Sequence, residues 1–289
     1  ADVRDAERIG RIFSDQRPEL VFHAAALKHV PMVELHPDEG SLTNVIGTKV
    51  VADACCAHGI RAMVLISTDK AVNPSSMMGA TKRVAESYCQ ALDLREAARG
   101  NERTHFVTVR FGNVLGSSGS VVPLFEKQIA AGGPVTLTDA AVTRYFMTVE
   151  EASSLVLQAA TLQEKGGQTD LFVLDMGEPM PILKLAETMI RLKGLVPGVD
   201  IQITTTGLRD GEKMHEVLTY DHEAISPTAV DGVMHVVTMG KPSELFDKRL
   251  EELIHAASQR DRSEALRLLG VLVPEYAAER AEKARRWSA

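Results

Sequence analysis

The sequence predicts an α/β fold built on a doubly wound parallel sheet, with a smaller lobe and a helical C-terminal extension. Short apolar runs such as 20–26, 62–66 and 105–110 alternate with longer helical segments, which is typical of parallel strands joined by crossover helices. After Gly112 this alternation becomes less regular, as expected for a separate lobe. From Lys241 onward the composition is helical and charged, which predicts the extension.

The individual helices and strands are predicted from the periodicity of apolar residues and from the residue types that begin and end helices. Up to Arg110 we expect a polar helix, a buried parallel strand at 20–26, a helix at 44–58, a strand at 62–66, a helix at 78–95 and a strand at 105–110. Beyond Gly112 we expect a helix at 121–131, a short strand at 135–138, a helix at 148–163, a strand at 171–174, an amphipathic helix at 182–193 and a strand at 201–205. Thr148 and Glu151 form a capping box, and Gly194 ends the helix at 182–193.

Composition excludes several classes of protein. The 289 residues are 45% hydrophobic and 25% charged, as in ordinary globular proteins. A net charge of −7 argues against a nucleic-acid-binding surface, which needs a basic face. No apolar run approaches the roughly 20 residues that cross a bilayer, and residues 1–15 lack the apolar region of a signal peptide. We expect Cys55, Cys56 and Cys89 to be reduced core thiols of a cytoplasmic protein, and no cysteine spacing suggests a metal site.

Two polar motifs indicate chemistry at one edge of the sheet. Residues 67–70 (Ser-Thr-Asp-Lys) close the strand at 62–66, and residues 78–82 (Met-Gly-Ala-Thr-Lys) open the next helix. Ligands of open α/β sheets bind at the carboxyl ends of the strands, where these motifs must lie. A hydroxyl, a carboxylate and two amines there can supply an acid, a base and a lysine that orients a cofactor. The combination suits chemistry on a dinucleotide and a sugar.

The motifs resemble those of the extended short-chain dehydrogenase/reductases, and more narrowly the UDP-N-acetylglucosamine 4,6-dehydratases of bacterial polysaccharide and glycan synthesis. The family usually carries Tyr-x-x-x-Lys, in which the tyrosine is an acid/base and the lysine holds the nicotinamide ribose. Here Met78 stands at the tyrosine position, and a thioether cannot titrate. The large, membrane-anchored dehydratases of the family also resemble this chain in having methionine there. The resemblance runs from Asp2 to about Thr219 and implies a Rossmann-type core.

The resemblance implies a role for each polar residue of the motifs. Asp69 is expected to be the acid at O6 of the sugar, Lys70 the base at C5, Thr68 a hydrogen-bonding group near O4, and Lys82 the ligand of the nicotinamide ribose. Asp69 and Lys70 then need pKa values shifted toward neutrality, which burial and proximity can supply. The alternative is an ordinary surface Asp-Lys pair, and the spacing from Met78 to Lys82 favours catalysis.

Further contacts are implied for cofactor and substrate. Residues expected at the cofactor are Asp2, Val3, Ala24, Ala25, Ala26, Lys28, Asn44, Lys82 and Phe111. Residues expected at the substrate are Lys28, His29, Asn113, Val121, Arg144, Arg209 and Glu212. Arg144 and Arg209 suit a diphosphate clamp because guanidinium groups bind phosphate bidentately, and Glu212 can accept from ribose hydroxyls. His23 is expected to be a core histidine.

One motif of the family has no counterpart. A complete dinucleotide fold begins with a strand and a G-x-x-G-x-x-G turn that seats the pyrophosphate, and nothing ahead of Leu20 matches it. We therefore expect the chain to start inside the fold, with the first strands missing and the cofactor site incomplete. We divide the chain into a partial dinucleotide-binding core at 1–115, a mainly substrate-binding lobe at 116–240 whose strands return to the core, and the helical extension at 241–289, with Trp287 as a docking anchor.

The expected activity is NAD- or NADP-dependent dehydration of a UDP-N-acetylhexosamine, first of all UDP-N-acetylglucosamine, to a 4-keto-6-deoxy sugar, with a tightly bound, recycled cofactor and no metal. Two alternatives remain. A 4-epimerase shares the scaffold but normally keeps the tyrosine. A non-catalytic dinucleotide or nucleotide-sugar sensor is favoured by Met78 and the missing glycines, and opposed by the intact Asp69-Lys70. We also expect the protein to form a homo-oligomer and to have no nucleic-acid partner. The longer parent protein is expected to be anchored at the inner face of a bacterial membrane through a segment that this chain does not contain.

Overall fold

The centre of the protein is a six-stranded, mainly parallel sheet. The computed structural model describes residues 1–98, 103–162, 170–237 and 242–287, with side chains as far as Glu282. The strands lie in the order β1 (Leu20–His23), β2 (Ala62–Ile66), β3 (His105–Arg110), β8 (Asp170–Leu174), β12 (Val233–Val237) and β11 (Ala224–Pro227). The first four run parallel, and β12 and β11 are antiparallel to their neighbours. The predicted α/β class with a parallel-dominated sheet is confirmed.

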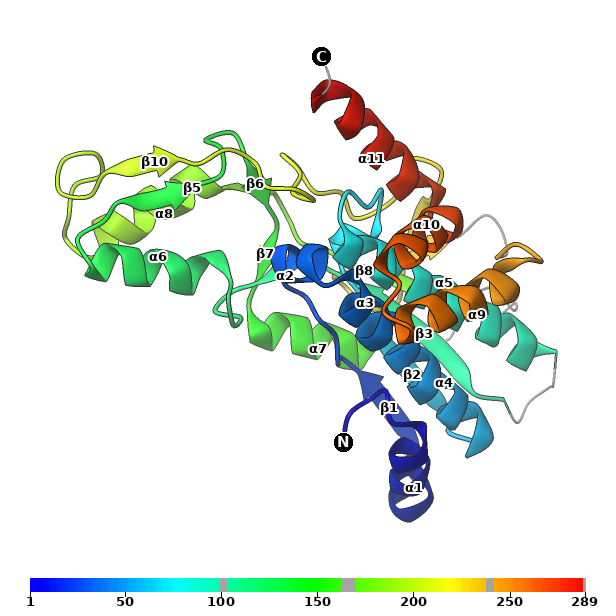
Figure 1. The fold of residues 1–289 in the computed structure, drawn as a ribbon. Helices are drawn as coiled ribbons and strands as arrows, with labels where there is room; N and C mark the ends of the chain where they lie inside the picture. Colours follow the sequence, from blue (N-terminus) through cyan, green and yellow to red (C-terminus); the bar gives the residue numbers. More distant parts are fainter. Residues whose placement is uncertain (99–102, 163–169, 238–241, 288–289) are drawn as a thin grey trace.

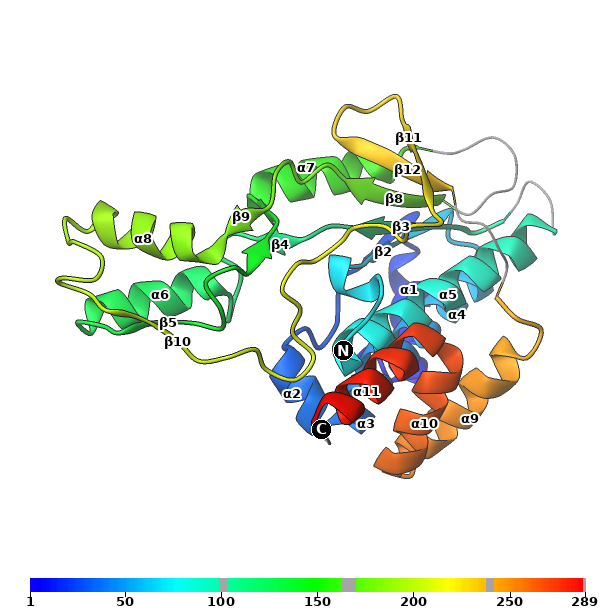
Figure 2. The same ribbon diagram turned by 90° about the horizontal axis from the view of Figure 1, so that it is seen from above.

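Helices cover both faces of the sheet (Figure 1, Figure 2). α1 (Ala6–Gln16), α4 (Gly47–Ala57) and α5 (Met77–Ala97) lie on one face, and α7 (Val149–Ala159) lies on the other. Side chains therefore alternate between two cores. Met63 and Leu65 join the core on the α5 side, whereas Val64 joins the core that includes residues of α7. This two-sided burial explains why β2 is apolar throughout.

Strand β1 differs from its prediction. We expected a buried strand at 20–26, but β1 ends at His23, and Phe22 is 40% exposed. The reason is its place at the edge of the described sheet, where it pairs with β2 alone. The residues that follow, 24–29, run as a loop into α2 (Val30–Leu35).

The helical extension packs back onto the core as α9 (Phe246–Ser258), α10 (Arg262–Leu272) and α11 (Pro274–Trp287). Leu253 and Leu268 belong to the same hydrophobic cluster as Val84 of α5, so the extension covers the outer side of α5. Two short elements, α3 (Pro37–Gly40) and the π-helix η1 (Ser41–Ile46), lie beneath α9 and α10. The side chain of Trp287, which we expected to anchor this region, lies outside the described residues.

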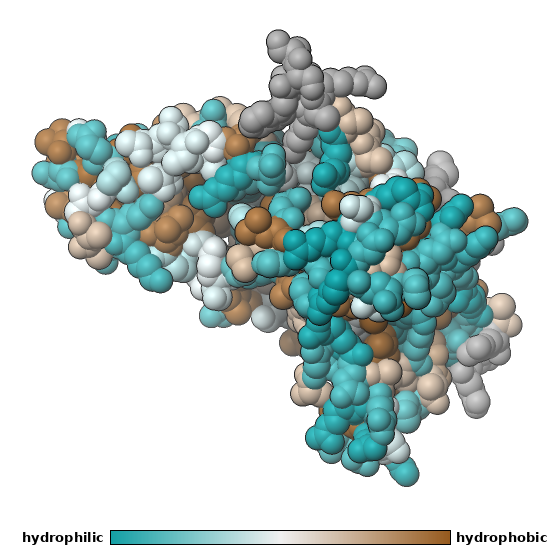
Figure 3. Space-filling view, viewed as in Figure 1, coloured by the Kyte–Doolittle hydropathy of each residue, from teal (hydrophilic) through white to brown (hydrophobic). Residues whose placement is uncertain are grey.

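A smaller lobe projects to one side of the sheet (Figure 1). It contains α6 (Val121–Ala130), β5 (Val135–Leu137), α8 (Ile182–Leu192) and β10 (Ile203–Thr205), with β5 and β10 paired in parallel. Phe125, Ile190 and Ile201 are buried in a core of its own. Apolar side chains are also visible on its surface (Figure 3), and Leu192 and Val199 are 79% and 74% exposed. The lobe is joined to the sheet through short strand pairs, which are β4 (Asn113–Val114) with β7 (Phe146–Met147) and β6 (Thr143–Arg144) with β9 (Met180–Pro181).

Several local predictions can be compared directly with the structure. The Thr148–Glu151 capping box is present, and Gly194 follows α8 with a φ of 75°. The helix expected at 44–58 corresponds to α4, which begins at Gly47 directly after the π-helical turn η1, so the expected start at residue 44 lies inside that turn. Cys55 and Cys89 are buried, but Cys56 is only half-buried, because successive residues on a helix face different directions. Within the described parts of the chain, no helix combines the length and apolarity needed to cross a membrane.

Candidate active site

The two polar motifs meet at the carboxyl end of β2, as expected. Residues 69–71 form a short 3-10 turn, η2 (Asp69–Ala71), capped by Thr68. Ser76 caps α5 by accepting a hydrogen bond from the Gly79 N–H at 3.1 Å. A Cβ atom on Gly79 would lie 2.1 Å from the Lys70 carbonyl oxygen, so only glycine lets α5 begin this close to η2.

Asp69 and Lys70 form a hydrogen-bonded ion pair. Lys70 Nζ donates to Asp69 Oδ1 at 2.9 Å and to Asn113 Oδ1 at 3.3 Å. The Thr68 hydroxyl also donates to Asp69 Oδ1, at 2.8 Å. The Asp69 side chain is fully buried, whereas Lys70 remains 22% exposed. A carboxylate and an amine are thus held in direct contact.

The charge state of Lys70 does not follow the expectation. Burial disfavours its ammonium, but the negative charges of Asp69 and Glu216 and the hydrogen bond to Asp69 outweigh burial and raise the pKa of Lys70. The expected shift of the Lys70 pKa toward neutrality is therefore wrong. Burial lowers the pKa of the neighbouring Lys213, against the opposing charge of Glu216. Sequence analysis missed Glu216 and Lys213 as site residues, although both lie in or near the motif that contains Arg209 and Glu212.

Lys82 lies on α5 beside the pair. Its Nζ donates to the Ile66 carbonyl oxygen at 2.7 Å, and its side chain is almost fully buried. Burial lowers the pKa of Lys82 to about 8, partly opposed by the charge of Glu86. Met78, one turn before it, is also buried. Burial, with the charge of Lys82, lowers the pKa of His23 to about 4, which fits the expected core histidine.

An inner pocket of about 280 Å³ opens beside these residues. Small residues Ala24, Ala26 and Gly112 line it together with Lys82 and Met78. The absence of bulky side chains at the two alanines and the glycine lets a planar ring approach the backbone. The Lys82 ammonium has three N–H donors, and only one of them is used by the Ile66 carbonyl oxygen. These residues fit the nicotinamide end of a dinucleotide. Thr68, Lys70, Lys28, Phe111 and Asn113 also line this pocket.

Not every residue predicted at the cofactor lies in the inner pocket. Asp2 makes an ion pair with Arg4 at 2.7 Å, and the hydrogen bond with Arg4 lowers the pKa of Asp2 to about 2. Val3 packs against Gly47, where a Cβ atom would lie 2.6 Å from it. Ala25 is exposed and is not among the residues that line the pocket. Asn44 contributes indirectly, because it bonds the backbone of Leu27, which does line the pocket.

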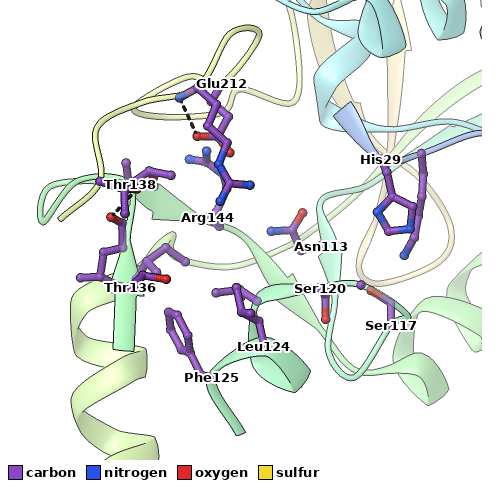
Figure 4. Close-up of a pocket in the computed structure, with 18 residues that line it drawn as sticks. His29, Asn113, Ser117, Ser120, Leu124, Phe125, Thr136, Thr138, Arg144 and Glu212 are labelled. Carbon is purple, nitrogen blue, oxygen red and sulfur yellow. Dashed lines mark hydrogen bonds between the residues drawn. The ribbon is translucent and has the colours of Figure 1, made fainter. Parts of the chain in front are cut away.

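An outer pocket of about 300 Å³ adjoins the inner one (Figure 4). It brings together all the residues expected at the substrate: Lys28, His29, Asn113, Val121, Arg144, Arg209 and Glu212. Lys28 and Asn113 line both pockets, so the two lie against each other. Ser120, the residue before α6, turns its hydroxyl into this region without a hydrogen-bond partner among the described residues. The pocket combines arginines and a helix N-terminus, both of which favour phosphate.

Arg144 has a second role that sequence analysis did not foresee. Its guanidinium donates to the carbonyl oxygens of Thr143 at 2.7 Å, Met214 at 3.1 Å and Lys213 at 2.8 Å. Glu212 accepts a hydrogen bond from the Arg209 N–H at 3.1 Å. Arg144 therefore holds the loop that carries Arg209 and Glu212 against the pocket, in addition to facing the pocket itself (Figure 4).

A buried cluster of charged residues lies next to the site, in the interior of the protein. The fully buried Arg110 makes two hydrogen bonds with Glu86, at 2.9 and 2.8 Å, and two with Glu223, at 3.1 and 2.8 Å. The Ser67 hydroxyl donates to Glu86 Oε1 at 2.5 Å. Burial would raise the pKa of Glu86, but the charge and hydrogen bonds of Arg110 lower it to about 2. The cluster links β3, α5 and the segment that follows the loop of Arg209 and Glu212.

Comparisons with known proteins found similar sequences. A family described as polysaccharide biosynthesis protein matches residues 1–238. The capsular polysaccharide biosynthesis protein CapD of Staphylococcus aureus is 51% identical over 223 residues, or 77% of this chain. The UDP-N-acetylglucosamine 4,6-dehydratase (inverting) of Campylobacter jejuni is 36% identical over 239 residues, or 78% of this chain. The matched segments amount to 36% and 66% of the lengths of those two relatives.

A solved structure supports the fold. The UDP-glucose 4-epimerase of Thermotoga maritima with UDP-glucose superimposes with a TM-score of 0.65 at 23% identity, over 76% of this chain and 74% of that one. At that identity the likeness concerns the fold alone, and it confirms the Rossmann-type α/β class.

Proposed function

This chain belongs to the family of polysaccharide biosynthesis proteins, and from that membership we propose that it dehydrates a nucleotide sugar with the help of a nicotinamide cofactor. The proposed substrate is a UDP-N-acetylhexosamine, first of all UDP-N-acetylglucosamine, and the product is a 4-keto-6-deoxy sugar for surface polysaccharide or glycan. The observation that carries the proposal is the Asp69–Lys70 pair, with 2.9 Å between Lys70 Nζ and Asp69 Oδ1. Lys70 lines the inner pocket, and the buried Asp69 is bonded to it without lining either pocket.

The two pockets suit the two ends of such a substrate. Arg144, Arg209 and the start of α6 favour the diphosphate in the outer pocket. Asn113 and Lys28 line both pockets, so a sugar attached to that diphosphate would reach Lys70 in the inner pocket. Lys82, Ala24, Ala26 and Gly112 would hold the nicotinamide end of the cofactor, which would supply a reversible hydride acceptor for the chemistry at C4 and C6. NAD and NADP are both compatible with this assignment.

The Asp69–Lys70 contact can supply an acid and a base together. A proton that moves from Lys70 Nζ to Asp69 Oδ1 along their hydrogen bond leaves a neutral amine and a carboxylic acid. Oxidation at C4 makes the C5 proton acidic, and the Lys70 amine takes it. Asp69 then gives its proton to the departing 6-hydroxyl, which leaves as water. Lys70 finally returns a proton to C5. The O4 proton leaves through the Thr68 hydroxyl to solvent when C4 is oxidised, and Asp69 takes a proton from solvent after the water has left, so the cycle balances.

Met78 explains why a different residue must act at O4. Its buried thioether lines the inner pocket at the family's tyrosine position but carries no proton to exchange. Thr68 is the nearest candidate, because its hydroxyl lines the same pocket and is already bonded to Asp69. An epimerase on the same fold would need an acid/base at O4 only. The second acid–base pair therefore favours dehydration.

The test is an incubation of the full-length protein with UDP-N-acetylglucosamine and NAD or NADP in deuterated water, followed by mass spectrometry. Loss of one water with deuterium at C5 supports the proposal. An unchanged mass with inverted C4 would instead establish an epimerase. Binding of UDP without turnover would establish a sensor. Asp69→Asn should abolish turnover and keep UDP binding, whereas Lys127→Met, an exposed lysine on α6, should change neither.

A further inference from the structure

A buried carboxylate lies next to the proposed catalytic pair without lining either pocket. The Glu216 side chain is 3% exposed, and its Oε1 lies 3.9 Å from Lys70 Nζ. Its Oε2 lies 3.6 Å from Lys213 Nζ and has no hydrogen-bond partner within the described part of the chain. Burying a carboxylate is costly unless charges compensate for it. The two ammonium groups are that compensation.

Lys213 connects this carboxylate to the outer pocket. Its Nζ donates to the Val72 carbonyl oxygen at 2.8 Å, just after η2, and its own carbonyl oxygen accepts from Arg144 at 2.8 Å. Glu216 therefore stands between one ammonium at the reacting centre and another on the loop that carries Arg209 and Glu212. Asp69, Lys70, Lys213 and Glu216 form a charge quartet of two anions and two cations.

We propose that Glu216 is a positioning residue, which stabilises the ammonium form of Lys70 and holds that side chain at the inner pocket. It acts through Lys70 and does not touch the substrate. Its catalytic consequence rests on the proposed function, since a base that has just taken a proton from C5 is an ammonium and needs a nearby anion. The charged groups that face Lys70 are Asp69 and Glu216, which favour the ammonium, and Lys213 and Arg144, which oppose it.

The charge quartet predicts that substitutions of Glu216 and Lys213 change the ease of forming the neutral amine of Lys70 in opposite directions. Glu216→Gln removes an anion near Lys70, so the neutral amine becomes easier to form. Lys213→Met removes a cation that repels Lys70 and competes for Glu216, so the neutral amine becomes harder to form. Glu216→Asp keeps the charge and should restore the wild-type behaviour in large part. A purely structural role for Glu216 would not produce shifts of opposite sign.

The first measurement needs no turnover. The rate at which an amine-specific reagent labels Lys70 at about pH 9, followed by mass spectrometry of its peptide, reports the neutral fraction of that side chain. We expect labelling to be roughly tenfold faster in Glu216→Gln, which corresponds to about one pH unit, and several-fold slower in Lys213→Met. Labelling of the exposed Lys127 in the same samples serves as the control. Thermal unfolding identifies any variant that fails to fold.

The second measurement uses turnover. In Glu216→Gln, the acidic limb of the kcat/KM profile should move about one pH unit lower and kcat at the plateau should fall, because a weaker base is formed, while KM stays unchanged. In Lys213→Met the limb should move to higher pH. Equal labelling of Lys70 in all the folded variants would overturn the inference, even if dehydration is established. Shifted labelling without any turnover would keep the inference and overturn the proposed function.

Discussion

Asn44 and Leu27 are joined by two hydrogen bonds, one from the Leu27 N–H to Asn44 Oδ1 at 2.7 Å and one from Asn44 Nδ2 to the Leu27 carbonyl oxygen at 3.0 Å. The same Nδ2 donates to Thr81 Oγ1 on α5 at 3.0 Å. A fully buried amide thus fixes the loop after β1 to the helix that carries Met78 and Lys82. The wall of the inner pocket depends on this link.

Asn44→Ala should therefore destabilise the protein and loosen the pocket. Two backbone groups of Leu27 lose their partner, and we expect the free energy of unfolding to fall by about 3 kcal/mol. Urea unfolding measures this loss. Ser153→Ala, on the exposed face of α7, should change it by less than about 0.5 kcal/mol. Equal unfolding free energies for the two variants would show that the Asn44 amide does not stabilise the protein.

Lys82 predicts a pH dependence of stability. Its ammonium loses a proton near pH 8 in the folded protein but only near 10.5 in the unfolded chain. Between these values the unfolded state binds more protons, so stability rises with pH, by up to about 3 kcal/mol. Lys82→Met removes this dependence. The difference in unfolding free energy between variant and wild type should be constant below pH 8 and change by that amount toward pH 10.5. Lys127→Met should give a curve parallel to wild type.

The buried Arg110 should matter far more than an exposed arginine. Arg110→Met removes the countercharge of Glu223 in the interior and leaves Glu86 with Arg83 alone, and we expect a loss of about 3–5 kcal/mol. Arg95→Met breaks a pair with Asp247 whose side chains are 46% and 59% exposed, and should lose less than about 1 kcal/mol. Denaturant unfolding of both variants at neutral pH makes the comparison.

The same cluster predicts a response to acid. The lowered pKa of Glu86 gives stability that is complete above its ordinary value of 4.5 and disappears as the pH falls toward 2. Arg110→Met should lose this part of the acid dependence. An unchanged slope of stability between pH 4.5 and 2 in that variant would contradict the assignment of the shift to Arg110.

Two glycines before α6 provide a matched pair of variants. Gly116 and Gly119 have φ values of 71° and 68°, so alanine is strained at both. A Cβ atom at Gly119 would lie 2.2 Å from His29 Cε1, whereas nothing lies within 4 Å of one at Gly116. Gly119→Ala should displace His29 and raise KM for the nucleotide sugar roughly tenfold, or about 1.4 kcal/mol. Gly116→Ala should leave KM unchanged, and UDP binding by calorimetry checks both. The same KM in both variants would exclude a role for this contact.

The sequence predicted the parallel core and, through the family resemblance, nearly half of the residues that line the two pockets. Strands at 62–66 and 105–110 have the predicted bounds, because runs of apolar residues buried on both faces leave a clear local pattern. Short segments were also enough to indicate the polar groups of the site, which are the motifs at 67–70 and 78–82 and the arginines at 144 and 209. The residue types in each segment already indicate which chemistry it can support. These features depend on neighbours within a few positions along the chain.

Only the tertiary structure decided the charge of Lys70 and the position of β1. Asp69 and Glu216 together favour the ammonium form of Lys70. Glu216 is remote in sequence, and electrostatic energy depends on distances in space that spacing along the chain does not give. Strand β1 is half-exposed because it lies at an edge, and strand order is likewise a property of the whole sheet. The Glu86–Arg110–Glu223 cluster joins three distant segments for the same reason.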